Sequence, residues 1–278
     1  MNAPSSPRDA ARLAALPIGV FDSGIGGLTV IRALHRRLPR ENLLYFGDTA
    51  RVPYGPKSPV VVREYAAQDV DFLVGRGVKM IVVACNTVSA VALDVVQKRS
   101  RVPVVGMIMP GARAAAQASR VRRIGIIGTR GTIDSRAYEH ALRQLDPTIR
   151  VAAEACPLFV PLAEEGWEDH RSTALIAREY LFPLTQEGID TLVLGCTHYP
   201  VLRSAIDDAM ERRVTLIDSG EAAAVEVERL LAELGLGNTS SARPNLQWCV
   251  SDIPSRFAEV GARFFGSPLG RVERVTPW

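Results

Sequence analysis

Two of the four cysteines, Cys85 and Cys196, lie in similar sequences 111 residues apart. Residues 77–87 read GVKMIVVACNT and residues 188–198 read GIDTLVLGCTH, so each cysteine follows an apolar run and precedes a polar pair. Such a run predicts a buried strand, with the cysteine where the strand gives way to a helix. Backbone N–H groups and the helix dipole there favour a thiolate and bind carboxylates. Two opposed thiols could remove a proton from one face of a carbon and return one to the other.

The alternative for these cysteines is that both are small packing residues, because free cysteine is often buried. The two matched motifs favour chemistry for this pair, whereas Cys156 and Cys249 lack a partner motif and are predicted to be structural. Four cysteines without a C-x-x-C pair predict neither a disulfide scaffold nor a structural zinc site. With 3 lysines among 33 basic residues, few candidates exist for a Schiff base. The sequence therefore predicts no metal site.

Polar residues also end other predicted strands. Asp22 and Ser23 follow the first apolar run, and the glycines in residues 24–27 allow close approach of the backbone before a helix. That glycine pattern is also compatible with a nucleotide site. Residues 47–58, GDTARVPYGPKS, contain a stiff Pro-Tyr-Gly-Pro element that could present a side chain and backbone donors, or could be a simple turn.

Two further residues could assist the second thiol. His198 lies two positions beyond Cys196 and could orient that thiol or share its proton. Glu164 follows the sequence FVPLA in a predicted loop before the next helix, where it could equally be an exposed charge. We interpret His198 as functional because of its position beside Cys196.

Short apolar runs alternate with longer helical patterns along the whole chain. This alternation predicts an α/β fold of parallel sheets with helices on both faces and ligands at the carboxyl ends of the strands. The predicted strands are 17–22, 42–47, 79–84, 102–107, 123–128, 149–153, 190–195, 214–218, 246–250 and 270–275. The predicted helices are 27–38, 59–75, 87–99, 110–119, 132–145, 172–187, 199–211, 219–234 and 254–265, with the loop 236–244 between the last two.

The chain also contains an internal repeat. Besides the cysteine motifs, residues 18–27 resemble residues 124–132, and residues 101–115 resemble residues 213–225. Three pairs in the same order indicate two related α/β halves, although glycine after a strand is common in α/β proteins. If the halves face each other, the two thiols lie across a shared cleft.

The overall composition is that of an ordinary globular protein. The 278 residues are 47% hydrophobic and carry a net charge of +3, which predicts no nucleic-acid partner. No apolar stretch is long enough to predict a membrane span. Residues 1–16 lack the core of a signal peptide and are predicted to be a disordered extension, so we expect a cytoplasmic location.

Seven motifs together resemble the glutamate racemases of bacterial cell-wall synthesis, within the cofactor-independent aspartate/glutamate racemase superfamily. They cover the chain from about residue 17 to about 235 and read VFDSGIGGLTV, FGDTARVPYG, VVACNT, IGTRGTI, CPLFVPLAEEG, LGCTHYP and LIDSGEA. The resemblance implies a small-molecule substrate, with L- and D-glutamate interconverted by two bases without a cofactor. The sequence GMIMPGA (106–112), near the domain crossover, departs from many relatives at Met107 and Met109.

The resemblance also implies roles for single residues. Cys196 and Cys85 match the two catalytic cysteines, which would deprotonate L- and D-glutamate respectively, and Asp22, His198 and Glu164 match residues that assist them. The positions that would hold the substrate are Asp22, Ser23, Tyr54, Gly55, Asn86, Thr87, Thr129, Thr132, Thr197 and His198. The family fold implies a discontinuous first domain of 17–108 and 216–278 and a second domain of 109–215. Because family members are often dimers, a homodimer is compatible with the resemblance.

Three other classes of function share part of this pattern. An aspartate racemase, a hydantoin racemase or a maleate isomerase would share the paired cysteines, but the motif wording favours glutamate. A cysteine phosphatase needs Cys-x5-Arg, and this chain has Val91 and Leu202 at those positions. A nucleotide- or flavin-binding module would leave both cysteine motifs unexplained.

Overall fold

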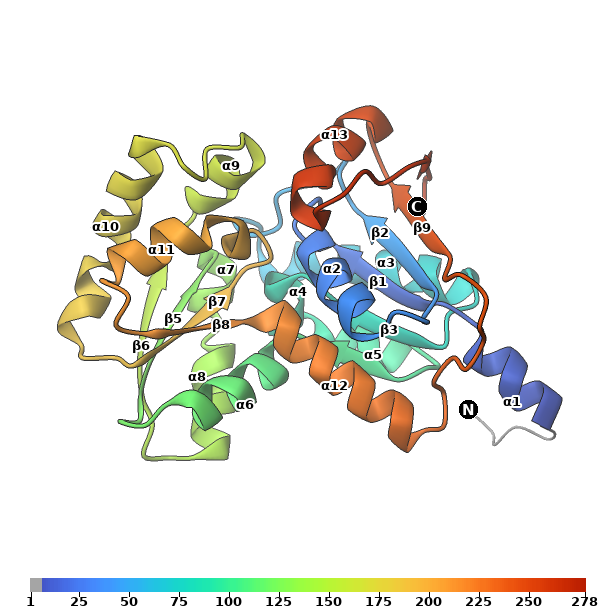
Figure 1. The fold of residues 1–278 in the computed structure, drawn as a ribbon, viewed down its shortest axis with the longest axis horizontal. Coiled ribbons are helices and arrows are strands. Elements are labelled where there is room, and N and C mark those ends of the chain that lie inside the picture. Colours follow the sequence, from blue (N-terminus) through green and yellow to red (C-terminus); the bar gives the residue numbers. More distant parts are fainter. Residues whose placement is uncertain (1–6) are drawn as a thin grey trace.

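Ten strands, all paired in parallel, form within residues 7–278, which are the residues that the computed structural model describes. They make two sheets that lie side by side (Figure 1). The first sheet, in the order β10-β9-β2-β1-β3-β4, contains β1 (Ile18–Asp22), β2 (Leu43–Gly47), β3 (Met80–Val83), β4 (Val104–Gly106), β9 (Leu246–Val250) and β10 (Val272–Arg274). The second, in the order β6-β5-β7-β8, contains β5 (Arg123–Gly128), β6 (Arg150–Ala155), β7 (Thr191–Gly195) and β8 (Thr215–Asp218). The predicted α/β class is confirmed.

The two sheets share a common topology. The order β2-β1-β3-β4 in the first sheet repeats as β6-β5-β7-β8 in the second, so β3 corresponds to β7. Cys85 and Cys196 come two residues and one residue, respectively, after these two strands. The predicted repeat of the sequence thus coincides with a repeat of the fold.

Helices cover both faces of each sheet. The helices are α1 (Pro7–Ala14), α2 (Leu28–Arg37), α3 (Pro59–Gly75), α4 (Asn86–Val91), α5 (Leu93–Arg99), α6 (Ile108–Ala118), α7 (Arg130–Asp134), α8 (Ala137–Leu145), α9 (Phe159–Glu164), α10 (Arg171–Gln186), the 3₁₀-helix η1 (Tyr199–Leu202), α11 (Arg203–Ala209), α12 (Ser219–Glu233) and α13 (Pro254–Phe265). In the first sheet, Phe21 and Ile81 pack with one apolar cluster, whereas Val20 and Val82 pack with another. Neighbouring residues of a strand therefore face opposite layers, as burial on both faces requires.

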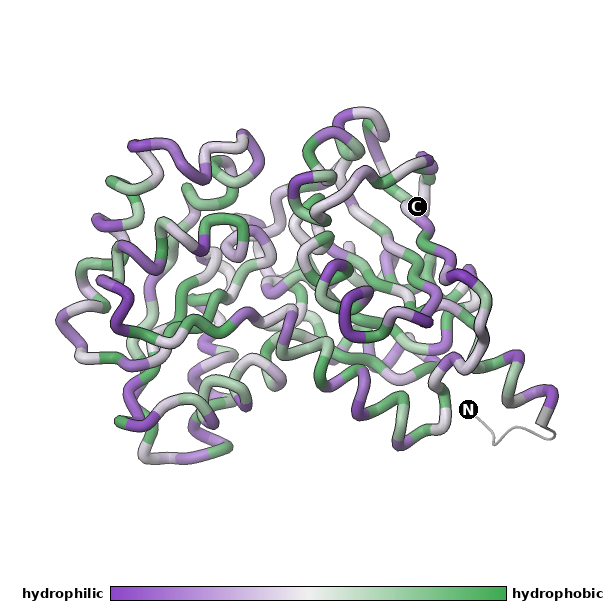
Figure 2. The backbone as a smooth tube through the Cα atoms, viewed as in Figure 1, coloured by the Kyte–Doolittle hydropathy of each residue, from purple (hydrophilic) through white to green (hydrophobic). Residues whose placement is uncertain are grey.

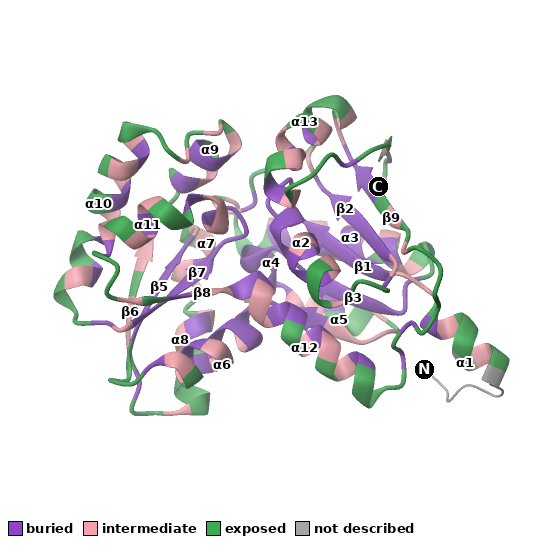
Figure 3. Cartoon of the chain, in the orientation of Figure 1, coloured by how far each residue is buried: buried purple, intermediate pink, exposed green. Residues whose placement is uncertain are grey.

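The hydrophobic core runs through the strands of both domains. Figure 2 shows hydrophobic residues along the strands and polar residues concentrated on the outer turns. Figure 3 shows the same strands as buried, with exposed residues gathered on the outer helices. β6 is the exception, because its residues are half-buried or exposed at the edge of the second sheet.

Several helices differ from the sequence prediction. The predicted helix 87–99 is split at Ala92, whose φ of −138° leaves the helical region, into α4 and α5. The predicted helix 132–145 is split at Arg136, which has a left-handed φ of 53°, into α7 and α8. Glu164, which was predicted to lie in a loop, is the last residue of α9.

The prediction of a disordered segment over 1–16 is wrong for residues 7–14, which form α1; residues 1–6 lie outside the described part. The carbonyl of Ala14, the last residue of α1, accepts a hydrogen bond from Lys79, which is buried and paired with Glu41. Lys79 also donates to the carbonyl of Leu236 at 2.8 Å. Because a buried ammonium must be hydrogen-bonded, this contact fixes the end of α1 against the start of β3.

The chain crosses between the two sheets twice. It leaves the first sheet between β4 and α6, and it returns between β8 and α12. The two helices that follow these crossings, α6 and α12, pack against each other. The second sheet ends at Asp218, three residues beyond the predicted domain boundary at 215. Asp218 is also the N-cap of α12, since its carboxylate accepts hydrogen bonds from the N–H groups of Gly220 and Glu221.

Candidate active site

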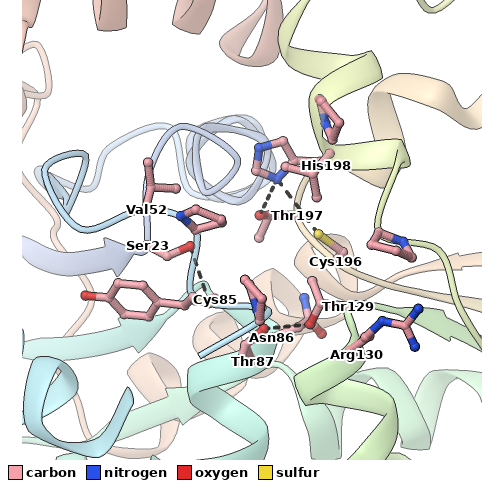
Figure 4. Close-up of a pocket in the computed structure, with 17 residues that line it drawn as sticks. Ser23, Val52, Cys85, Asn86, Thr87, Thr129, Arg130, Cys196, Thr197 and His198 are labelled. Carbon is pink, nitrogen blue, oxygen red and sulfur yellow. Dashed lines mark hydrogen bonds between the residues drawn. The ribbon is translucent and has the colours of Figure 1, made fainter. Parts of the chain in front are cut away.

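A cavity of about 230 Å³ lies between the two domains, at the carboxyl ends of their strands. Figure 4 shows Cys85 and Ser23 on one side of it and Cys196 and Thr197 on the other. This is the place that the switch in strand order favours for a ligand. The residues that line it are Ser23, Val52, Pro53, Tyr54, Gly55, Pro56, Cys85, Asn86, Thr87, Thr129, Arg130, Pro157, Val160, Pro161, Cys196, Thr197 and His198.

Cys85 lies at the beginning of α4, where the chain turns out of β3. Its Sγ is 3.7 Å from the hydroxyl of Ser23, and the residue is only 5% exposed. Burial, followed by the negative charge of Asp22, raises the pKa of this thiol to about 12. Cys85 is therefore a protonated thiol at neutral pH.

Asp22 ends β1 beneath the cavity wall and does not line the cavity. Its Oδ2 accepts hydrogen bonds from the backbone N–H groups of Gly24 at 3.1 Å and Gly27 at 3.0 Å. The other oxygen, Oδ1, is buried without a hydrogen-bond partner in the described residues. Burial raises the pKa of this carboxyl group, against the opposing effect of the charge on His198.

Cys196, His198 and Glu164 form a chain of contacts on the opposite side. His198 Nδ1 is 3.8 Å from Cys196 Sγ, and Nε2 is 2.9 Å from Glu164 Oε1. Burial alone would lower the pKa of His198, but the interactions with Cys196 and Glu164 outweigh it and raise the pKa to about 10. Burial would also raise the pKa of Glu164, but its hydrogen bond with His198 lowers it instead. A protonated imidazole thus lies beside the Sγ atom of Cys196. Glu164 itself does not line the cavity.

The turn after β7 packs closely against the turn after β1. Thr29 donates a hydrogen bond to the carbonyl of Thr197 at 2.9 Å. A Cβ atom on Gly26 would lie 2.2 Å from Thr197 Oγ1 and 2.4 Å from His198 Nδ1, so only glycine fits there. This contact between the domains holds the turn that carries Cys196 and His198.

Hydroxyl groups from both domains meet on the lower wall of the cavity in Figure 4. Thr87 Oγ1 from α4 is 2.8 Å from Thr129 Oγ1, and Thr129 Oγ1 is 3.1 Å from Thr132 Oγ1. Thr132 lies behind the other two and does not line the cavity. Asn86 accepts a hydrogen bond from Tyr138 at 2.7 Å and donates one to Ser219, so its amide is held at the domain boundary.

The loop after β2 covers part of the cavity. Gly55 lines it, and its carbonyl accepts a hydrogen bond from the N–H of Gly131 across the domain boundary at 3.1 Å. Tyr54 also lines the cavity, but its hydroxyl is bonded to Asp48 and Asp69 inside the first domain. Its phenol oxygen is therefore engaged by these two carboxylates.

The structure brings most of the predicted residues to one place, but three of them stand behind the wall: Asp22, Thr132 and Glu164. The sequence reasoning missed Arg130 and the apolar residues Pro157, Val160 and Pro161 as parts of the wall. The signal for Arg130 was its position directly after Thr129, at the end of the strand that corresponds to β1.

The described residues contain no group of three or more His, Cys, Asp or Glu side chains that could hold a metal ion. None of the helices within residues 7–278 has the length and apolar character to cross a bilayer.

Known proteins resemble this chain over nearly its whole length. The family model described as Asp/Glu/Hydantoin racemase matches residues 18–227. Glutamate racemase from Geobacter metallireducens is 51% identical over 259 residues, which are 93% of this chain and 96% of the relative. A crystal structure of glutamate racemase from Francisella tularensis in complex with D-glutamate has a TM-score of 0.90 and 40% identity, covering 95% of this chain and 98% of that one. Glutamate racemase from Thermus thermophilus in complex with β-chloro-D-alanine has a TM-score of 0.86 and 46% identity, covering 95% and 98%.

Two like α/β domains around a cavity with one thiol from each, together with these similarities, define an enzyme of the isomerase class that acts as an amino-acid racemase. The chain belongs to the Asp/Glu/hydantoin racemase family.

Proposed function

We propose that this enzyme interconverts L- and D-glutamate with Cys85 and Cys196 as its two bases, and that its D-glutamate serves peptidoglycan synthesis. The observation that carries the proposal is that both thiols line one cavity, each from a different domain. The names of relatives at about 50% identity support glutamate as the substrate.

The family resemblance assigns L-glutamate to Cys196 and D-glutamate to Cys85, and the different surroundings of the two thiols fit this assignment. In the L-to-D direction, the Cys196 thiolate beside protonated His198 takes the α-proton. The Cys85 thiol, whose pKa burial raises to about 12, gives its proton to the opposite face of the carbanion. The step breaks one C–H bond and one S–H bond and forms one of each, so Cys196 ends as a thiol and Cys85 as a thiolate. The D-to-L direction starts from that state.

The substrate is an anion, and the wall offers mostly neutral donors. The hydroxyls of Ser23, Thr87 and Thr129 and the N–H groups at the starts of α4 and α7 would hold its carboxylates. Arg130 is the one basic side chain in the wall besides His198. The apolar residues of the wall exclude water, which strengthens each of these interactions.

Racemisation in deuterated water tests the proposed reaction. D-Glutamate formed from L-glutamate should carry deuterium at its α-carbon, because the returned proton comes from a thiol that exchanges with solvent. Product without deuterium would contradict the two-base proposal, and racemisation of aspartate in preference to glutamate would contradict the proposed substrate.

Substitution of each thiol tests the assignment of the bases. Cys85→Ala and Cys196→Ala should each abolish racemisation, whereas Cys249→Ala, at a buried cysteine on β9 outside the cavity, should retain it. An alanine variant of either proposed base with a near wild-type rate would refute the assignment.

Cofactor, location and assembly belong to the same proposal. The reaction as written needs neither pyridoxal phosphate nor a metal, so activity should survive dialysis against a carbonyl reagent and a chelator. We place the enzyme in the cytoplasm, where the two thiols stay reduced. The homodimer is tested by sedimentation equilibrium, in which a mass near the 30.2 kDa of one chain would contradict it.

A further inference from the structure

The loop between β2 and α3 forms much of the cavity wall without being a helix or strand. It contributes five consecutive lining residues, 52–56, and its Gly55 carbonyl bonds to the second domain. A loop has no ladder of backbone hydrogen bonds to fix it, so other contacts must hold it. Besides this bond to the second domain, contacts within the first domain hold the loop.

A buried cluster of charges lies beneath this loop. Asp48 and Asp69 are both fully buried, and Arg51 joins them, with Nε 2.5 Å from Asp48 Oδ2 and Nη2 2.9 Å from Asp69 Oδ1. The hydroxyl of Tyr54 bonds to the same two carboxylates. Burial, followed by the charge of Asp48, raises the pKa of Asp69 well above its usual range. The single positive charge of Arg51 therefore balances the charge of this pair of carboxyl groups. The position of Tyr54, and hence of the loop, depends on where Arg51 lies.

Two aromatic rings enclose the guanidinium group of Arg51. Its Cζ lies 4.1 Å from the ring centre of Tyr65 on α3 and 3.9 Å from that of Trp278. Trp278 is four residues beyond β10, whose pairing with β9 brings the C-terminal segment to this place. The cation–π contacts and the cover of the two rings restrict Arg51 to the orientation that pairs both carboxylates.

The C-terminal segment lies outside the region that the family model matches, which ends at residue 227. We propose that Trp278 is a positioning residue for substrate binding, which clamps Arg51 and so holds the loop 48–58 in the shape that lines the cavity. The proposal rests on the proposed function for its substrate. Trp278 is itself half exposed and lines no part of the cavity, so it acts through Arg51 and Tyr54.

Trp278→Ala tests this role by separating substrate binding from chemistry. We expect KM for glutamate to rise about fivefold, the size expected for a lost cation–π contact, while kcat stays within about twofold. The thiols are held by β3 and β7, which the substitution does not touch. Trp278→Phe keeps an aromatic face over Arg51 and should restore most of the affinity. Phe182→Ala, at an exposed aromatic residue on α10, is the matched control and should change neither constant.

Hydrogen exchange of the loop gives a second measure that does not depend on the substrate. The N–H groups of Ala50, Arg51 and Lys57 are hydrogen-bonded within or beside the loop and should exchange faster in Trp278→Ala, while those of β3 should not. An unchanged KM, or loop exchange at the wild-type rate, would overturn the clamp. If the wild type does not racemise glutamate, the proposed function fails, and the exchange experiment still decides the clamp.

Discussion

The two thiols that line the cavity have different electrostatic surroundings. Cys85 lies above buried Asp22, whose charge adds to burial in raising the pKa of the thiol. Cys196 lies beside His198, whose pKa is raised to about 10 by its contacts with the thiol and with Glu164. The proposed two-base reaction needs one thiol and one thiolate at the same time, and the surroundings of the two cysteines differ accordingly.

Asp22→Asn should make Cys85 easier to ionise. Removal of the buried negative charge lowers the pKa of the Cys85 thiol. If this pKa falls by about one, the fraction of Cys85 present as thiolate at neutral pH rises about tenfold. The measurement is the rate of iodoacetamide alkylation of Cys85, followed by mass spectrometry, with Cys249 as the internal control. Alkylation at the wild-type rate would show that Asp22 does not control this thiol.

Glu164→Gln should change how stability depends on pH. The pKa of His198 is raised in the folded protein from 6.5 to about 10, so its stabilising contribution is complete below about pH 6.5 and is lost as the pH rises through 10. Glu164→Gln removes one cause of the raised pKa. The variant should be less stable than the wild type by at least about 1 kcal/mol near pH 6.5, and the difference should shrink toward pH 10. Urea unfolding across this range measures it, and a constant difference would contradict the assignment.

The turns after β1 and β7, which carry several of the proposed site residues, pack against each other. Gly26 lies in the turn before α2, packed so closely against Thr197 and His198 that a Cβ atom would overlap both. Thr29 donates a hydrogen bond to the carbonyl of Thr197. Neither turn could hold its side chains alone, because each leaves its sheet as a short irregular segment.

Gly26→Ala should impair catalysis. The new Cβ atom would displace Thr197 or His198, since it would lie 2.2 Å and 2.4 Å from their nearest atoms. Displacement of about 1 Å at a catalytic group lowers rates by about 100-fold, so we expect kcat to fall between about tenfold and 100-fold. Gly75→Ala at the end of α3 meets no atom within 4 Å and serves as the control. Equal kcat values for the two variants would contradict this role of Gly26.

Most strands could be predicted from the sequence because burial on both faces leaves continuous apolar runs, whereas the edge strands β6 and β10 are half-buried or exposed. All ten predicted strands are present in the structure. The contacts of Glu164 could not be predicted, because its pairing with His198 depends on a short helix, α9, that carries no strong sequence pattern. Tyr54 was predicted from the motif, but the engagement of its hydroxyl by Asp69 joins residues of different elements. Such contacts follow from the assembled fold rather than from local sequence.

The whole molecule carries a small positive charge, and Arg130 is a cation in the cavity wall that forms no ion pair with the described residues. The net charge is +3. Many of the arginines form ion pairs on the surface, as Arg36, Arg37 and Arg63 do. Arg130 lines the cavity and has no ion pair or hydrogen bond within the part of the chain that is described. A cation in this position attracts anionic ligands from solution.

Arg130→Gln should weaken the attraction of the dicarboxylate substrate. We expect kcat/KM for glutamate to fall about threefold at low ionic strength, with the effect shrinking as added salt screens the charge. Kinetics at several salt concentrations measure this, with Arg130→Lys as the charge-conserving control. An effect of Arg130→Gln that does not vary with salt would contradict an electrostatic role.

The two chain crossings also set the order in which the domains can be completed during synthesis. The last strand of the second sheet, β8, ends at Asp218, so this domain has its full set of strands once residue 218 has left the ribosome. The first sheet begins earlier in the chain but is completed by β9, which pairs with β2, and by β10, which pairs with β9 and ends at Arg274. One edge of β2 therefore stays unpaired until about the last thirty residues have been synthesised. During that interval the unpaired edge can form non-native strand pairs.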